Sequence, residues 1–241
     1  MRSAPVPPTV SLLLAGLSAG CSFGLSSSIE VGVDTFASGE DTAGIDAASG
    51  LPPTAVSLVG MTYAIGADTM VIVDPPGLDG FKDQILARDV LVFVAGQDQE
   101  ALKLNIALAG ADGAQDVCEA VRTFPTADYS RNPAFEAGPG ELHTTFGGGH
   151  AAAFRELELT GIFDEYAFNW RNGTLDAMLD GRELAPALPK GADVCKLVDG
   201  MGGACEPCDD GEEACFHLRI EQVVAERVEI EFDVTPTGCD E

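Results

Sequence analysis

The sequence predicts a mainly β protein, either an antiparallel β-sandwich or an incomplete barrel with a few short helices. Two observations favour this class. Short segments in which apolar and polar residues alternate recur along the chain, and a period of two is typical of strands that bury one face. Turns rich in glycine, proline and asparagine separate these segments, as in folds made of many short strands.

A first hairpin is expected between residues 89 and 108. The run from Asp89 to Ala95 is apolar almost throughout, as in a strand that is buried on both faces. Leucine and isoleucine then alternate with other residues over 102–108. The turn between the two strands is predicted at Gly96-Gln97-Asp98-Gln99.

A second hairpin is expected around Asn172-Gly173. Tyr166, Phe168 and Trp170 alternate with polar or small residues before this dipeptide, and residues 175–179 alternate after it. Asn-Gly favours the two positive-φ positions of a type I′ turn, which is the commonest short connection in a hairpin. The chain is therefore predicted to reverse at these two residues.

The same alternation predicts further strands at residues 55–65, 69–73, 142–146, 155–163, 216–221 and 228–234. Short helices are predicted at residues 78–87, 114–122 and 193–199. The stretch from Phe124 to His150 is rich in proline and glycine, so we expect a long loop with at most one short strand. Because long loops often carry function, a binding surface is first expected there.

The N-terminus has the order of a secretory signal. Arg2 is followed by an apolar segment around residues 10–17 and by small residues before Cys21. The sequence Leu17-Ser18-Ala19-Gly20-Cys21 resembles the lipobox of bacterial lipoproteins. This resemblance implies that residues 1–20 are a signal peptide and that the chain is cut before Cys21. It also implies that the cysteine thiol carries a diacylglyceryl group, with the new amine often acylated.

The chain departs from the lipobox at one position. The family usually has leucine three positions before the cysteine, where this chain has Ser18 and where Leu17 stands one position further back. Cleavage by the ordinary signal peptidase, which gives a secreted protein, therefore stays an alternative. Ser22, rather than aspartate, follows the cysteine, and the same resemblance then implies an outer-membrane lipoprotein of the cell envelope.

Residues 21–53 are predicted to be the lipidated cysteine followed by a flexible tether. The segment is rich in serine and glycine and ends at Pro52-Pro53. A coil of this length reaches about 30 Å from its anchor. Residues 54–241 are predicted to form a single β-rich domain whose C-terminal part is rich in cysteine.

Six cysteines remain if Cys21 is lipidated, and an even number in an exported chain predicts disulfides. The six are Cys118, Cys195, Cys205, Cys208, Cys215 and Cys239. The predicted pairs are Cys195–Cys205, Cys208–Cys215 and Cys118–Cys239. Two alternatives stay open, namely a redox-active CxxC at Cys205 and Cys208, and zinc bound by Cys195, Cys205, Cys208 and Cys215.

The composition is strongly acidic, because 13 Lys+Arg against 39 Asp+Glu give a formal net charge of −26. Nucleic acid is therefore a poor partner, and adhesion to anionic lipid headgroups is disfavoured for the same reason. One acidic turn is a candidate calcium site, since calcium prefers several carboxylate oxygens on a flexible loop; the alternative is a solvated turn. Its carboxylates are Asp209, Asp210, Glu212 and Glu213. Apart from calcium, no cofactor is expected.

These observations lead to three functional hypotheses, none with a predicted catalytic residue. The leading one is a membrane-anchored envelope lipoprotein whose domain is a non-catalytic binding or structural module for a protein or glycan partner. The second is an exported hydrolase with a carboxylate or metal site, either in the Phe124–His150 stretch or in the Cys205–Cys215 turn. The third is a carrier of a hydrophobic ligand, which requires an apolar cavity inside a barrel.

Overall fold

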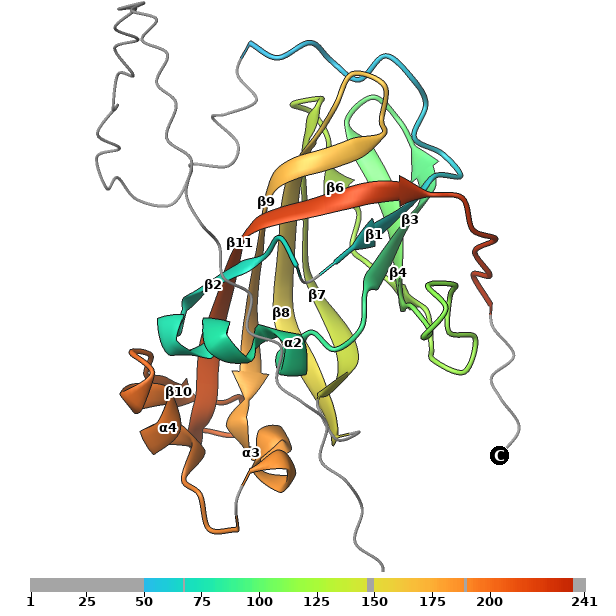
Figure 1. The fold of residues 1–241 in the computed structure, drawn as a ribbon. Coiled ribbons are helices and arrows are strands. Elements are labelled where there is room, and N and C mark those ends of the chain that lie inside the picture. The colour runs from blue at the N-terminus through green and yellow to red at the C-terminus, as the bar shows by residue number, and fades with distance from the viewer. Residues whose placement is uncertain (1–49, 67, 147–149, 189, 236–241) are drawn as a thin grey trace, which may run out of the picture. The chain divides into compact units, whose positions relative to one another are not determined.

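The structure, a computed structural model, describes residues 50–66, 68–146, 150–188 and 190–235. Within these ranges, eleven strands form one antiparallel sheet, and eight of them close on themselves because β11 pairs with both β9 and β1 (Figure 1). The mainly β class is confirmed, but the sandwich is wrong and the barrel is closed rather than incomplete. The predicted signal peptide, Cys21 and the predicted tether as far as residue 49 lie outside the described residues.

The ring of eight strands has a simple neighbour order. In this order, its strands are β1 (Thr62–Ile65), β3 (Val90–Gln97), β4 (Ala101–Leu108), β6 (Ala127–Asp128), β7 (Ala134–Phe146), β8 (His150–Phe163), β9 (Asn169–Asp180) and β11 (Glu213–Val228). Off the ring, β2 (Val71–Asp74) and β10 (Cys205–Pro207) pair with β11, and β5 (Arg122–Thr123) pairs with β4.

The helical segments are short. They are η1 (Pro76–Phe81), α2 (Lys82–Ile85), α3 (Gly181–Leu184), η2 (Ala185–Ala187) and α4 (Val194–Gly200). The predicted helix at 193–199 is confirmed as α4, which begins after Asp193, whose side chain accepts a hydrogen bond from the Lys196 N–H. Over the described ranges, no helix combines the length and the apolar character that crossing a bilayer requires.

Aromatic side chains fill part of the barrel interior. The rings of Phe135 and Trp170 stack with centroids 4.4 Å apart, and Tyr63 lies 5.4 Å from Phe163. The Tyr63 hydroxyl, in a side chain that is almost fully buried, donates a hydrogen bond to the carbonyl oxygen of Ala167. An eight-stranded barrel has an interior just wide enough for its own side chains, so these rings occupy space that a carried ligand would need.

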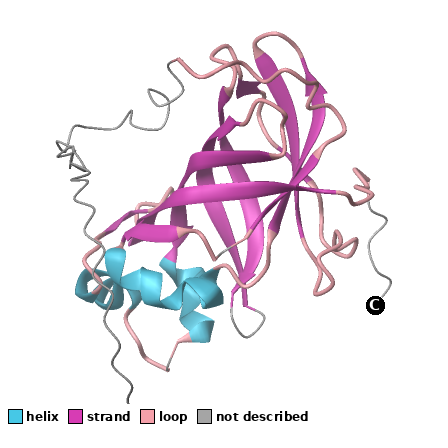
Figure 2. Cartoon of the chain, turned by 45° about the horizontal axis from the view of Figure 1, so that its top comes forward, coloured by secondary structure: helices cyan, strands magenta, loops and turns pink. Residues whose placement is uncertain are grey.

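The two ends of the barrel are built differently (Figures 1 and 2). At the first, which we call the entry end, residues 54–58 lie across the hairpin loops β3–β4 and β8–β9 and the loop before β7. Three backbone N–H groups hold this segment: Thr54 N to Asn132 Oδ1, Ala55 N to Glu165 O, and Leu58 N to Gln97 Oε1, each at 2.8 Å. At the other, which we call the far end, β9 finishes at Asp180 among α3, α4 and β10.

The predicted β3–β4 hairpin is confirmed, but the predicted turn at Asn172-Gly173 is wrong. Strand β9 runs through these residues, and the chain reverses at residues 164–168. The Asp164 carboxylate accepts hydrogen bonds from three backbone N–H groups of that loop. Glycine is needed at 173 for close packing, since a Cβ there would lie 2.6 Å from the Thr160 carbonyl oxygen, and Asn172 adopts a φ of 52° as at a β-bulge.

The long loop predicted from Phe124 to His150 is also wrong. About half of it is strand β7, and β8 begins at its last residue. Pro139 fits inside β7 because the register with β8 shifts on both sides of Gly140, and proline is tolerated at such bulges. Within the described part of this stretch only short connections remain, at residues 124–126 and 129–133, so the long loop on which a binding surface was expected does not form there; residues 147–149 lie outside the described ranges.

Two more predicted elements are wrong. Residues 114–122 form turns rather than a helix, because the Gln115 side chain exchanges hydrogen bonds with the backbone of Asp233 at 2.8 and 2.7 Å. The strand predicted at 228–234 does not form, since β11 ends at Val228, where its pairing with β1 also ends. Strand β11 instead joins the strand expected at 216–221 to the residues that follow it.

Candidate functional site

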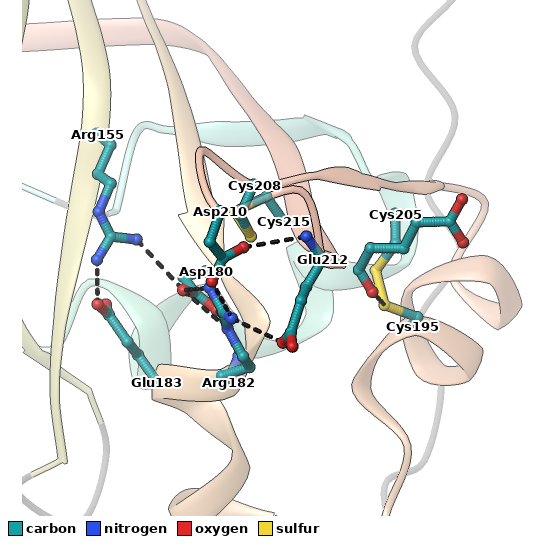
Figure 3. Close-up of a disulfide and its surroundings, with 11 residues drawn as sticks. Arg155, Asp180, Arg182, Glu183, Cys195, Cys205, Cys208, Asp210, Glu212 and Cys215 are labelled. Atoms are coloured by element: carbon teal, nitrogen blue, oxygen red, sulfur yellow. Dashed lines mark hydrogen bonds and ion pairs between the residues drawn. A yellow bond between two sulfur atoms is a disulfide. The ribbon is translucent and has the colours of Figure 1, made fainter.

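A cleft of about 390 Å³ opens on the outer wall of the barrel at the far end. One side is formed by the outward-facing residues of β8 and β9, and the other by the loop that joins β10 to β11. Arg155, Asp180 and Arg182 lie on the first side, and Asp210 lies on the second. Figure 3 shows these side chains converging beside the Cys208–Cys215 disulfide.

Asp180 is the most buried charged residue of the cleft, with 8% of its surface exposed. It precedes α3, and its Oδ1 accepts a hydrogen bond from the Arg182 backbone N–H at 2.9 Å. The Arg182 guanidinium binds both carboxylate oxygens, with Nε 2.8 Å from Oδ1 and Nη2 2.6 Å from Oδ2. These hydrogen bonds outweigh burial and lower the pKa of Asp180, which therefore stays ionised at neutral pH.

Arg182 joins the barrel wall to the disulfide-closed loop. Its Nη1 lies 2.6 Å from Asp210 Oδ2 and 3.0 Å from Glu212 Oε2. The hydrogen bonds from Asp180 and Asp210 raise the pKa of Arg182 above its already high ordinary value. A single guanidinium is therefore shared among three carboxylates from two separate elements (Figure 3).

Arg155 extends this network along β8. Its Nη1 is 3.7 Å from Asp180 Oδ2, and its Nη2 binds Glu183 of α3. Glu183 Oε2 also accepts a hydrogen bond from the Ala153 backbone N–H at 2.7 Å. The helix that follows β9 is therefore fixed to the neighbouring strand through one carboxylate.

Two disulfides hold the other side of the cleft. Cys195 of α4 is bonded to Cys205 of β10, and Cys208 is bonded to Cys215 of β11. Both predicted pairs are confirmed. Cys118 is also disulfide-bonded, and its predicted partner Cys239 lies outside the described residues.

This pairing bears on the two alternatives for the cysteines. Cys205 and Cys208 are bonded to different partners, so they do not form the disulfide of a redox CxxC. The four sulfurs suggested as zinc ligands are all in disulfides and offer no thiolate to a metal. Asp180 lies close enough to Cys208 and Cys215 for the three to surround an ion. The two sulfurs are bonded to each other, however, and offer no thiolate to a metal.

The predicted calcium residues take different positions. Asp210 and Glu212 face Arg182, whose guanidinium occupies the place where a cation bound by both would sit. Asp209 and Glu213 are exposed. The loop is tightened from within by a hydrogen bond of 3.0 Å from the Glu212 N–H to Asp210 Oδ1. The four carboxylates therefore do not converge on one point.

The cleft as a whole is negative. Five carboxylates line it against the two guanidiniums of Arg155 and Arg182, which gives a formal charge of −3. Three of the five, Glu156, Glu206 and Asp209, are exposed and make no ion pair with another described residue. The arrangement is suited to a ligand with ammonium or guanidinium groups.

A second hollow, of about 320 Å³, adjoins the cleft and shares Glu156 and Met178 with it. His217 of β11 lines it, with Nδ1 3.2 Å from Asp74 and Nε2 bound to Asp176. Burial lowers the pKa of His217, but the hydrogen bonds and charges of these two carboxylates outweigh it and raise the pKa above its ordinary value. The imidazole ring therefore bridges β2 and β9.

Four residues of the cleft and the second hollow were not predicted from the sequence: Arg155, Asp180, Arg182 and His217. One local signal was available, because an aspartate directly after an alternating segment and before Gly-Arg-Glu is typical of a helix start. Arg155 and His217 each lie within an alternating strand. On the polar face of such a strand, the sequence does not distinguish a charged residue of a site from one that is only solvated. No protein family, curated protein or solved structure matches this chain.

Proposed function

We propose that this chain is an exported lipoprotein of the cell envelope, anchored through Cys21, and that its barrel binds a basic segment of a partner protein in the acidic cleft. The observation that carries the proposal is the pair of disulfides Cys195–Cys205 and Cys208–Cys215, the second of which lines that cleft. Disulfides form and persist outside the reducing cytosol. The lipobox-like sequence before Cys21 then supplies the means of export and attachment.

The charges of the cleft favour a cationic partner. The two arginines are already engaged by carboxylates of the same chain, whereas Glu156, Glu206 and Asp209 face solvent. A lysine- or arginine-rich segment would pair with these three groups without breaking the existing ion pairs. The acidic surface would also speed the encounter with a basic protein, most strongly at low salt.

The hydrolase and carrier hypotheses receive less support. In the second hollow, the imidazole of His217 has both nitrogens engaged by carboxylates, so neither is available to take a proton from a substrate. In the barrel interior, the stacked rings of Phe135 and Trp170 fill space that an apolar ligand would need. Binding at the outer wall needs neither a free imidazole nitrogen nor an empty barrel interior.

Fractionation tests the anchor. The wild-type protein should be found in membranes and take up a labelled fatty acid, whereas Cys21→Ala should appear unlabelled in the soluble fraction. Ser27→Ala, a change in the predicted tether, is the matched control and should behave as wild type. An unchanged membrane-bound share of Cys21→Ala would contradict the anchor.

A peptide titration tests the cleft. The triple variant Glu156→Gln/Glu206→Gln/Asp209→Asn should weaken binding of an octalysine peptide by about tenfold, if each lost pair contributes about 0.5 kcal/mol. The control Glu136→Gln/Glu229→Gln/Glu231→Gln removes the same charge from exposed residues that do not line the cleft. Equal losses in the two triple variants would mean that only the net charge attracts the peptide.

A further inference from the structure

We propose that the entry end of the barrel lies against the bilayer that holds the lipid anchor, so that the acidic cleft faces away from the membrane. The surface contacted is one of zwitterionic headgroups, such as phosphatidylethanolamine. This inference rests on the proposed anchor at Cys21. It adds to that anchor a second, non-covalent contact and a fixed orientation of the domain.

The first support is where the chain joins the barrel. Hydrogen bonds from Thr54, Ala55 and Leu58 fasten the N-terminal segment across the entry end. The described chain therefore begins at this end, and 28 residues separate Gly50 from Cys21 in the sequence. A coil of that length spans about 30 Å, so the anchor keeps the entry end within reach of the headgroups.

The second support is the distribution of exposed apolar side chains. Nine large apolar residues are exposed within the described ranges, and five of them belong to the β8–β9 loop or to residues 51–59, which include and flank the segment that crosses the entry end: Leu51, Val56, Val59, Tyr166 and Phe168. The other four are distributed over separate parts of the chain: Phe81, Val117, Leu197 and Val234. Single exposed apolar residues are ordinary on soluble proteins, whereas their concentration at one place marks a contact surface.

The third support is how the two aromatic residues are held. Tyr166 and Phe168, 57% and 56% exposed, occupy the β8–β9 loop, whose backbone is fixed by Asp164. Their ring centroids lie 6.4 Å apart, and the Arg227 guanidinium lies 5.3 Å from the Phe168 ring centre. Aromatic residues with a polar partner are characteristic of the membrane–water interface, where one part of the side chain meets apolar chains and another meets water.

Charge decides which lipid is contacted. With a net charge of −26, the protein is repelled by an anionic surface. The loops and strand ends at the entry end carry both signs with an excess of three carboxylates: Asp98, Glu100, Asp128, Asp164 and Glu165 against Arg131 and Arg227. Anionic headgroups would repel such a surface, whereas zwitterionic headgroups carry no net charge to repel it.

The contact need not be strong on its own. The tether predicted from the sequence would, at this length, hold the domain at an effective concentration of about 1 mM near the surface. A dissociation constant of about that size is therefore enough to keep the domain docked for half of the time. Strand β9 leads from the entry end to Asp180 over 12 residues, or about 40 Å. Because the strands of a barrel tilt by about 35 to 45° from its axis, docking would present the cleft about 30 Å from the headgroups.

The test compares Tyr166→Ser/Phe168→Ser with the matched control Phe81→Ser/Leu197→Ser, which removes two exposed apolar residues from other parts of the chain. Lipidated full-length protein is placed on a supported bilayer of phosphatidylethanolamine and phosphatidylcholine, and neutron reflectometry measures the gap to the headgroups. Wild type and control should lie against the headgroups, and the aromatic variant should be separated from them by a water layer. The same gap in all three would overturn docking.

A second measurement keeps docking and anchoring apart. Unlipidated Cys21→Ala protein is sedimented with vesicles of the same lipids, and the aromatic changes should lower its partition by about tenfold while the control changes leave it unaltered. A wild-type protein that takes up no labelled fatty acid and stays soluble in cells, with this partition intact, would overturn the anchor alone. A partition insensitive to the aromatic pair, or aromatic-dependent dimers in place of vesicle binding, would overturn docking alone.

Discussion

Asp180 and Arg182 are two residues apart and bind each other through two parallel hydrogen bonds of 2.8 and 2.6 Å. The pair forms because Asp180 ends β9 and precedes α3, so the turn of the chain brings the arginine back over the carboxylate. Asp180 is almost buried, whereas Arg182 reaches the loop closed by Cys208 and Cys215. Arg182 thus joins the barrel wall at Asp180 to the disulfide-closed loop on the other side of the cleft.

We expect Asp180→Ala to lower the free energy of unfolding by about 2 kcal/mol, because it removes charge-assisted hydrogen bonds at a buried position. Urea unfolding at neutral pH measures the change. Asp209→Ala is the matched control, since Asp209 lines the same cleft but is exposed, and it should change the free energy by less than about 0.5 kcal/mol. Similar losses in the two variants would show that Asp180 is not held as described.

His217 should make stability depend on pH above neutrality. Its pKa is higher in the folded chain than the ordinary 6.5, so folding favours the protonated imidazole. The resulting stabilisation is fully present below pH 6.5 and is lost as the pH rises through the folded-state pKa. Wild type should therefore lose stability relative to His217→Gln as the pH rises above about 6.5 and through the higher folded-state pKa.

Two variants test the cause of this shift. In Asp74→Asn and in Asp176→Asn, the pKa of His217 followed by NMR should fall below the wild-type value, because each removes one of the two charges that raise it. The residue should then titrate closer to the behaviour of an exposed histidine. A wild-type His217 that titrates below 6.5 would contradict the bridging arrangement.

The local disulfides should contribute separately to stability. They close short loops, with sequence separations of 10 and 7, and removing either by a double Cys→Ser change should lower the free energy of unfolding by about 2 to 3 kcal/mol. Only loss of Cys208–Cys215 should also weaken octalysine binding, since this bridge fixes the loop that carries Asp210. Thiol titration of the unfolded, unreduced protein should find no free thiol at these four positions.

Some of these features could be predicted from the sequence because they are local. The pairs Cys195–Cys205 and Cys208–Cys215 join residues that are close in the chain, and the β3–β4 hairpin follows from continuous alternation. The cleft could not be predicted, because Arg182 meets Asp210 across 28 residues. That contact depends on β10 and β11 pairing beside β9, which local patterns do not specify.

The wrongly predicted turn at Asn172-Gly173 also shows that local patterns do not specify tertiary pairing. Asn172-Gly173 has the strongest short-range turn preference in the region, but the ladders with β8 and β11 continue on both sides of it. The barrel accommodates the dipeptide as a bulge because Gly173 lets the Thr160 carbonyl approach. Tertiary pairing therefore outweighs local turn preference at this position.

A comparison of two loop changes tests where the chain reverses. Asp164→Ala removes a carboxylate that accepts three backbone hydrogen bonds between residues 166 and 169, and we expect the free energy of unfolding to fall by about 1 to 2 kcal/mol. Asn172→Asp keeps a residue that tolerates positive φ, and it should change stability by less than about 0.5 kcal/mol. Amide exchange adds an independent readout, because the N–H groups of Tyr166 and Phe168 should lose protection in Asp164→Ala alone. If the chain turned at 172–173 instead, Asp164→Ala would leave these amides unchanged.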